Sequence, residues 1–313
     1  MNAEEIALTE PAAATPVLRS RGLWRDALHE TLHKKSAVFG FVLLGFLVPI
    51  ALLSPLIAPY GEREVLLDRP DIRPRQDPCV QLLGCDEGKP QHILGIDGNG
   101  RDVFSRLLYG ARISIVAGLA AVTFAVVIGT LLGLVAGYYG RWADSMIMRC
   151  MDVLLAFPAL LLAITIVTVL GNGLFNAVIA ISAVTIPVYA RVVRASVLSI
   201  RELDFVTADR ALGVSNLRIL WHRVLPNSLT PLVVQATLGI ATAVLELAAL
   251  SFLGLGGDPS QAEWGRMLAL ERNQVFTAPH LILFPGLMIM LNVLAFNLIG
   301  DGFRDALDPR LNR

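Results

Sequence analysis

Few charged side chains of this chain lie inside its long apolar runs. Glu246 is the one acid well inside such a run, and ionisable residues at membrane depth usually face a bundle interior or a water-filled cavity. Glu246 therefore either lines a path through the membrane, where it would attract an ammonium group, or is a structural hydrogen-bond or charge partner between subunits. Arg149 and Asp152 are three residues apart, so we predict that they pair on one helix face.

Two motifs that are typical of nucleotide-binding and hydrolytic enzymes are missing, so the sequence does not indicate an enzyme. The phosphate-binding pattern Gly-x4-Gly-Lys-Ser/Thr is missing, because the only Gly-Lys pair, Gly88-Lys89, is followed by Pro90 and has no glycine at the required spacing before it. The nucleophile pattern Gly-x-Ser-x-Gly is missing too. For His29 and His33, four residues apart, we expect no metal role. We predict no catalytic residue, no metal site and no cofactor bound by this chain.

Composition and apolar runs predict a membrane protein. Of 313 residues, 55% are hydrophobic and 17% are charged, whereas a soluble domain is about a quarter charged. The net charge of zero provides no basic field for a nucleic-acid partner. A spanning helix needs about 20 apolar residues. We predict an all-α protein in the lipid bilayer with six transmembrane helices, at 37–58, 113–140, 146–170, 173–193, 228–255 and 281–301.

Basic residues predict on which side the chain ends lie. Lysine and arginine near span ends favour the cytoplasm. The N-terminal arm, residues 1–36, contains an amphipathic segment and several basic residues, and the tail, residues 302–313, contains Arg304, Arg310 and Arg313. Six spans put both termini on one side. We therefore predict that the N and C termini are cytoplasmic.

This orientation assigns each long polar segment to a side of the membrane. Residues 59–112 and 256–280 become extracytoplasmic loops, and residues 195–227 become a cytoplasmic excursion. Arg101 and Arg106 oppose the assignment, as does Arg112, because they would lie just outside the second span. Their loop is long and rich in acids, which reduces their weight.

The first extracytoplasmic loop carries a cysteine pair. Cys79 and Cys85 lie close together in the sequence, and an oxidising compartment permits a disulfide. Closing so small a ring would stabilise the loop by roughly 2 kcal/mol on the chain-entropy model. A disulfide and two free thiols are the alternatives.

The cytoplasmic excursion predicts two short helices with a glycine between them. The pattern indicates a helix over 200–212, a break at Gly213, a cap at Ser215 and a second helix over 216–224. Leu225-Pro226-Asn227 then leads back into the membrane. Such a helix–Gly–helix unit is either a knob that a soluble partner grips or an ordinary folded loop.

Residues 203–227, LDFVTADRALGVSNLRILWHRVLPN, resemble the coupling loop of importer-type ABC permeases. The family pattern is Glu-Ala-Ala-x-x-x-Gly with a later Ile-x-Leu-Pro. Thr207 replaces the usual Glu, so the resemblance gives no specific ion pair to an ATPase, and Asp209 and Arg223 depart as well. The resemblance implies ATPase-coupling roles for Ala208, Asp209, Arg210, Gly213, Leu225 and Pro226.

Residues 94–115, 250–268 and 294–311 resemble segments of dipeptide, oligopeptide and nickel permeases. The resemblance implies the second permease subunit of a dipeptide/oligopeptide-type importer with the type I permease fold, in a bacterial plasma (inner) membrane. It implies as partners a homologous permease, two cytoplasmic ATP-binding subunits that hold ATP and Mg, and an extracytoplasmic substrate-binding protein. Di- and oligopeptides are the expected cargo, with glutathione, nickel or haem as alternatives.

Two other classes of protein fit the sequence less well. An ATP-independent channel or carrier usually has several intramembrane charges, filter-like glycine loops or internal repeats. The sequence has one intramembrane acid and no evident repeat. A membrane-embedded enzyme needs a pair such as Ser with His, or two Asp, at membrane depth, and none is present. We therefore expect a transport subunit whose assembled complex hydrolyses ATP.

Overall fold

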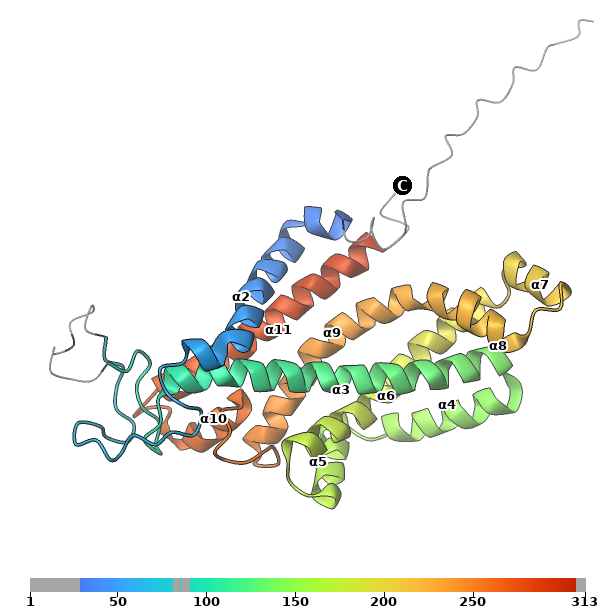
Figure 1. Cartoon of the computed structure of the whole chain (residues 1–313). Coiled ribbons are helices and arrows are strands. Elements are labelled where there is room, and N and C mark those ends of the chain that lie inside the picture. The colour runs from blue at the N-terminus through green and yellow to red at the C-terminus, as the bar shows by residue number, and fades with distance from the viewer. Residues whose placement is uncertain (1–28, 81–84, 86–90, 308–313) are drawn as a thin grey trace, which may run out of the picture.

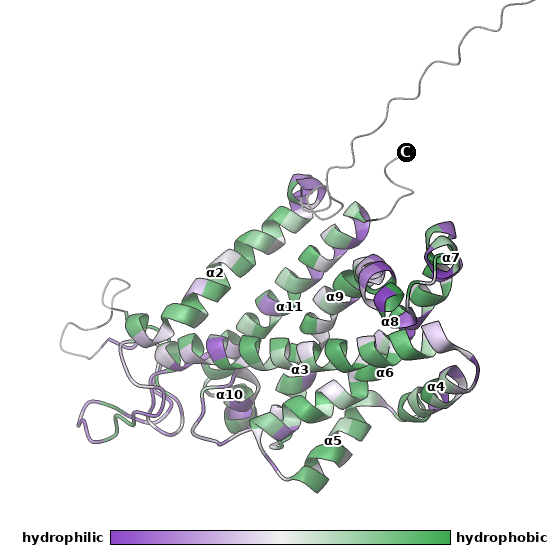
Figure 2. Ribbon diagram, turned by 45° about the vertical axis from the view of Figure 1, so that its right-hand side comes forward, coloured by the Kyte–Doolittle hydropathy of each residue, from purple (hydrophilic) through white to green (hydrophobic). Residues whose placement is uncertain are grey.

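The computed structural model describes residues 29–80, 85 and 91–307, which form helices and no β-strand. The long helices pack into one bundle whose surfaces are mainly hydrophobic, while hydrophilic residues gather in the connecting segments (Figures 1 and 2). The long helices are α2 Lys35–Ile57, α3 Val103–Tyr139, α4 Arg141–Leu155, α5 Ala159–Leu170, α6 Leu174–Ile200, α9 Leu225–Phe252 and α11 His280–Ala306.

Six membrane crossings are present if one bent pair of helices counts as a single span. Five helices of the described chain are long and apolar enough to cross a membrane, and α4 with α5 makes the sixth candidate with a bend of 93°. The span predicted at 146–170 is therefore wrong as a single helix. Pro158 lies in the break, and proline disfavours helical backbone at the residue before it and donates no N–H of its own.

Three other predicted spans are clearly longer in the structure, and one of them, α11, continues to Ala306 instead of 301. Helix α3 begins at Val103 instead of 113, because the Asp102 carboxylate caps it by accepting the Ser105 N–H at 2.8 Å. Helix α6 continues to Ile200 instead of 193. Arg106 and Arg112 are thus helical rather than part of a loop.

Glycine allows α3 and α6 to approach closely. Gly129, Gly133 and Gly137 recur every fourth residue on α3, and a Cβ on Gly133 would lie 2.5 Å from the Ala190 carbonyl oxygen of α6. Small residues at this spacing let helix backbones meet in membranes. The apolar core along this contact includes Val193.

Ion pairs join α4 to α6. Asp152 does not pair with Arg149 as predicted; its carboxylate contacts Arg191 at 2.5 Å. Asp144 contacts Arg194, with one N–O distance of 2.7 Å. Partners on a neighbouring helix replace the local pair because the charged face of α4 lies along α6.

The bundle has two contrasting ends, to which we give names. The loop end comprises residues 58–80, 85, 91–102 and 253–279, with the short helix α10 Trp264–Glu271. The knob end comprises residues 201–224. The start of α2 and the end of α11 also meet, through the 2.9 Å ion pair between Lys34 and Asp305.

Candidate functional site

The knob is a helix, a left-handed glycine and a second helical segment. Helix α7, Asp204–Ala211, starts later than predicted because α6 runs to Ile200 and a turn intervenes. Gly213 has φ +75°, and its N–H donates to the Arg210 carbonyl at 3.0 Å. Ser215 occupies the N-cap position of the next segment but makes no side-chain cap bond, so its predicted capping bond is wrong.

The second helical segment of the knob leads directly into the membrane helix. It consists of α8, Asn216–Ile219, followed by a π-helical turn over Leu220–Val224 that continues into α9. Leu225 is half-buried and Pro226 is exposed where the π-helical turn joins α9. The knob is therefore continuous with α9.

The knob is anchored to the bundle at its base. Val206 and Ile219 are fully buried in the core that α3 and α6 share. The Tyr138 hydroxyl of α3 hydrogen-bonds the Asn216 side chain at 2.9 Å, and the Arg210 guanidinium lies 5.4 Å from the centre of the Tyr138 ring. These contacts join the knob to the end of α3.

Two of the three residues that depart from the family pattern, Asp209 and Arg223, contact each other. The Arg223 Nε–H donates to the Asp209 carboxylate at 2.8 Å. The pair connects α7 to the π-helical turn. Asp209 thus has an intrachain role in the described structure, and Arg210 contacts α3, whereas Ala208 and Gly213 are exposed.

Three large apolar side chains of the knob are exposed among charged and polar ones. Leu212 is 81% exposed, Leu217 62% and Trp221 50%. Where exposed apolar side chains form a patch, they mark sites of interaction with other molecules. The sequence patterns drew attention to the glycine and the proline of this segment, whereas these three side chains provide its apolar surface.

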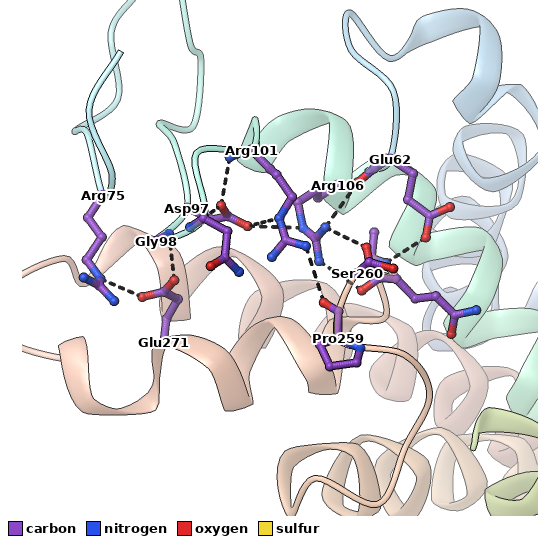
Figure 3. Close-up of polar contacts among 12 residues, drawn as sticks. Glu62, Arg75, Asp97, Gly98, Arg101, Arg106, Pro259, Ser260 and Glu271 are labelled. Atoms are coloured by element: carbon purple, nitrogen blue, oxygen red, sulfur yellow. Dashed lines mark hydrogen bonds and ion pairs between the residues drawn. The ribbon is translucent and has the colours of Figure 1, made fainter. Parts of the chain in front are cut away.

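The loop end buries its charges. Arg106 is 1% exposed, and its guanidinium donates to the carbonyls of Glu62, Ser260 and Gln261 at 2.9–3.2 Å (Figure 3). Asp97 lies 3.5 Å from Arg106 and accepts a 2.8 Å bond from Arg101. Two of the three arginines that opposed the predicted orientation, Arg101 and Arg106, are thus paired with a carboxylate within the fold.

A second set of contacts joins the two polar segments of the loop end. Glu271 on α10 accepts bonds from the Gly98 N–H at 2.8 Å and from Arg75 at 2.9 Å (Figure 3). Glu263 caps α10 through the Gly265 and Arg266 N–H groups at 2.9 and 2.8 Å, and burial raises the pKa of Glu263 above its usual range. These polar groups hold the loop end as one unit.

Cys79 and Cys85 are joined by a disulfide, one of the two alternatives that the sequence allowed, with Cα atoms 5.5 Å apart. Cys79 also exchanges backbone hydrogen bonds with His92, whose imidazole contacts Asp102 at 2.9 Å. The disulfide loop is therefore tied to the residue that caps α3.

Glu246 is half-buried on α9 and makes no hydrogen bond or ion pair with any other described residue. Both interpretations of Glu246 remain predictions.

A His-Glu-x-x-His sequence lies near the N terminus. His29-Glu30-Thr31-Leu32-His33 matches the His-Glu-x-x-His pattern of zinc enzymes. The His33 Nδ1 lies 2.7 Å from the His29 carbonyl oxygen. Among the residues that the structure describes, no three His, Cys, Asp or Glu side chains are grouped to hold a metal.

Comparison with known proteins identifies the class. Residues 129–313 match the family described as the binding-protein-dependent transport system inner membrane component, and residues 22–78 match the N-terminal TM domain of oligopeptide transport permease C. The dipeptide transport system permease protein DppC of Alkalihalophilus pseudofirmus is 47% identical over 92% of this chain and 90% of its own length. The glutathione transport system permease protein GsiD of Pectobacterium atrosepticum is 41% identical over 96% of both chains.

Solved structures show the same fold. The chain is similar to an inward-facing conformation of the MetNI methionine ABC transporter with a TM-score of 0.53 and 22% identity, over 66% of this chain and 97% of that one. The chain therefore belongs to the family of binding-protein-dependent transport system inner membrane components, with the type I ABC importer permease fold. It is a multi-pass permease subunit rather than a catalytic enzyme. Within the family it is a DppC-like permease.

Proposed function

We propose that this chain forms half of the membrane pathway of an ATP-driven importer of di- and oligopeptides, and that its knob receives the motion of the ATPases. The observation that carries the coupling role is the apolar surface of the knob on a buried base. Leu212 is 81% exposed, whereas Ile219 is fully buried. An anchored apolar knob at the end of a membrane bundle fits insertion into a soluble partner.

The proposed assembly contains this chain, a homologous permease, two ATP-binding subunits on the cytoplasmic side and a substrate-binding protein on the other side. ATP and Mg bind to the ATP-binding subunits. The knob end is cytoplasmic and the loop end is extracytoplasmic in a bacterial plasma membrane. The ion pair between Lys34 and Asp305 supports N and C termini on one side of the bilayer.

Closure of the ATPases on ATP would move the knob, and the bundle would follow. Asn216 contacts Tyr138 on α3, and the π-helical turn continues into α9 without a break. A push on the knob thus reaches α3 and α9 together. The transporter switches only if the ATPases bind the two access states with different free energies.

Peptide cargo is proposed from the relatives, several of which are dipeptide permeases. Glutathione, itself a small peptide, is the second candidate, because GsiD proteins are 41% and 44% identical to this chain. In both cases Glu246 is proposed to line the pathway. Uptake of a labelled dipeptide by the reconstituted importer, in competition with glutathione, separates the two cargoes.

The coupling role is tested by a charge on the knob and a matched charge at the loop end. Leu212→Glu places a carboxylate on the apolar surface of the knob. Phe276→Glu makes the same change at a side chain that is 99% exposed at the loop end. The complex is extracted in mild detergent, and the ATPases and the partner permease that co-purify are quantified.

We expect Leu212→Glu to lose at least about tenfold of the bound ATPase, because desolvating a charge in an apolar contact costs well over 1.4 kcal/mol. The partner permease should still co-purify with Leu212→Glu, and this co-purification shows that the helix bundle has folded. Phe276→Glu should keep both. Full ATPase binding by Leu212→Glu would refute the proposed contact, and equal loss in both variants would assign the effect to general instability.

A further inference from the structure

An apolar cleft with a volume of about 570 Å³ opens beside the loop end, between α3 and the start of α6. Tyr109 and Phe124 line one wall on α3, and Phe175 lines the other on α6. Small-ligand sites typically have volumes of about 300–1,000 Å³ and are mostly apolar, with few polar groups. The cleft has the size and the lining of such a site.

Arg112 is the cation of this cleft, and it differs from the other arginines nearby. Arg101 and Arg106 are buried and paired with Asp97. Arg112 is exposed, lines the cleft, and makes no ion pair or hydrogen bond with another described residue. A cation beside apolar walls without a protein partner is suited to an anionic group from outside the chain.

Glu62 provides a carboxylate in the same cleft. Its Oε1 accepts the Ala262 N–H at 2.9 Å, and its backbone carbonyl accepts a bond from the buried Arg106. These contacts hold Glu62 in place, while its Oε2 makes no hydrogen bond with the described residues. The Gln261 side chain also lines the cleft. One cleft thus presents a fixed negative group, an amide and an unpaired positive group.

We propose that this cleft receives a free peptide at the outer mouth of the pathway. Arg112 binds the C-terminal carboxylate, Glu62 binds the ammonium group, and the aromatic walls pack against the peptide side chains. The inference rests on the proposed peptide import and adds a recognition site within the permease. Charge complementarity favours a zwitterion here, because the Glu62 carboxylate repels an anionic lipid headgroup in the same cleft.

The test measures how a peptide protects a cysteine placed in the cleft. The full importer with its binding protein is reconstituted in lipid nanodiscs, with the exposed Cys150 replaced by serine. Phe175→Cys, at a position 67% exposed, reports the cleft, and Phe276→Cys reports the loop end outside it. Reaction with a charged thiol reagent is followed as alanyl-alanine is added.

We expect alanyl-alanine to protect Phe175→Cys and to leave Phe276→Cys reactive. Adding Arg112→Gln should raise the dipeptide concentration for half-protection about tenfold, as expected for loss of one charge-assisted hydrogen bond. Arg112→Lys should restore most of the protection. Arg149→Gln, which removes an exposed arginine outside the cleft, should leave it unchanged.

Other outcomes overturn the inference. Equal protection of both cysteines would assign the effect to the docked binding protein. If protection is unchanged by Arg112→Gln but increases with the phosphatidylethanolamine content of the nanodisc, the occupant of the cleft is a lipid. If the Arg112→Gln complex dissociates, Arg112 contacts another subunit. ATP-driven dipeptide uptake without protection of Phe175→Cys would refute peptide binding in the cleft but not peptide import. Absence of dipeptide uptake by the unaltered importer would refute the proposed peptide cargo.

Discussion

The two ends of the molecule handle polar and apolar surface in opposite ways. The loop end buries charge: Arg106 is 1% exposed and contacts carbonyls from two loops. The knob end exposes apolar surface: Leu212 is 81% exposed and Trp221 50%. At the loop end many buried polar groups contact one another within the chain, whereas the knob presents apolar side chains to its surroundings.

This difference separates stability from assembly. A buried charge costs several kcal/mol when its partner is removed, so the loop end should respond to mutation by losing its own structure. An exposed apolar surface costs the isolated chain little, so the knob should respond by losing a partner. Mutations at the two ends therefore have different expected readouts.

The largest expected effect comes from Arg106→Met, which keeps the length of the side chain but removes its charge. Asp97 loses a neighbouring cation and three carbonyls lose a donor. Breaking a buried pair costs about 3–5 kcal/mol. We expect a lower thermal midpoint of the detergent-solubilised complex and protease cleavage first at the loop end.

The control for that experiment is Arg63→Met. Arg63 is 59% exposed and its nearest carboxylate, Asp258, lies 3.9 Å away. Exposed ion pairs contribute about 0–1 kcal/mol to stability, so the thermal midpoint of this variant should be close to that of the unaltered complex. If Arg106→Met unfolds no earlier than Arg63→Met, the loop end is not held by its buried charges.

A smaller effect is expected at Gly213. A Cβ there meets no atom within 4 Å, so only the backbone opposes substitution, at φ +75°. Left-handed backbone costs most residues about 1–2 kcal/mol, and a β-branched residue suffers most. Gly213→Val should therefore distort the knob and reduce co-purifying ATPase severalfold while the bundle stays folded.

Asparagine provides the matched variant at this position, because it tolerates left-handed backbone better than valine does. Gly213→Asn should retain most of the ATPase. Equal ATPase binding by the valine and asparagine variants would show that the knob does not depend on the conformation of Gly213.

The sequence predicted the features that local rules govern. Apolar runs located the crossings, and Gly213 was correctly expected to end a helix, since a glycine that interrupts a helical pattern has few other uses. Pro158 lies in the third predicted span, but a proline permits any bend from a slight kink to a break, so the 93° angle does not follow from the sequence.

Contacts between distant segments were not predictable in this way. Asp209 and Arg223 looked like separate departures from a pattern, and only the folded knob shows that they pair. The charge of Arg106 opposed the predicted orientation of the chain in the membrane. Its contacts with Ser260 and Gln261 could not be predicted, because these residues are far away in the sequence. The four-residue spacing of Gly129 and Gly133 was a local signal that would have indicated close helix packing.

The smallest expected effect tests whether the loop end also depends on pH, through Glu263. Burial raises the pKa of this carboxyl group, so the native state holds its proton to a higher pH than the unfolded state does. Stability then falls as pH rises from the ordinary pKa of a glutamate through the raised one. Glutamine does not ionise, so Glu263→Gln should escape that fall, although it loses one of the two cap bonds to Gly265 and Arg266.

We therefore expect the thermal midpoint of Glu263→Gln, relative to the unaltered complex, to rise between about pH 5 and pH 8, by an amount that corresponds to about 1 kcal/mol or less. Glu64→Gln is the control, because Glu64 is exposed at the same end and should show no such trend. A relative midpoint that stays flat or falls with pH would mean that the cap bonds stabilise the carboxylate enough to offset its burial. The loop end would then tolerate the buried Glu263 carboxylate through its hydrogen bonds and the nearby Arg266 guanidinium.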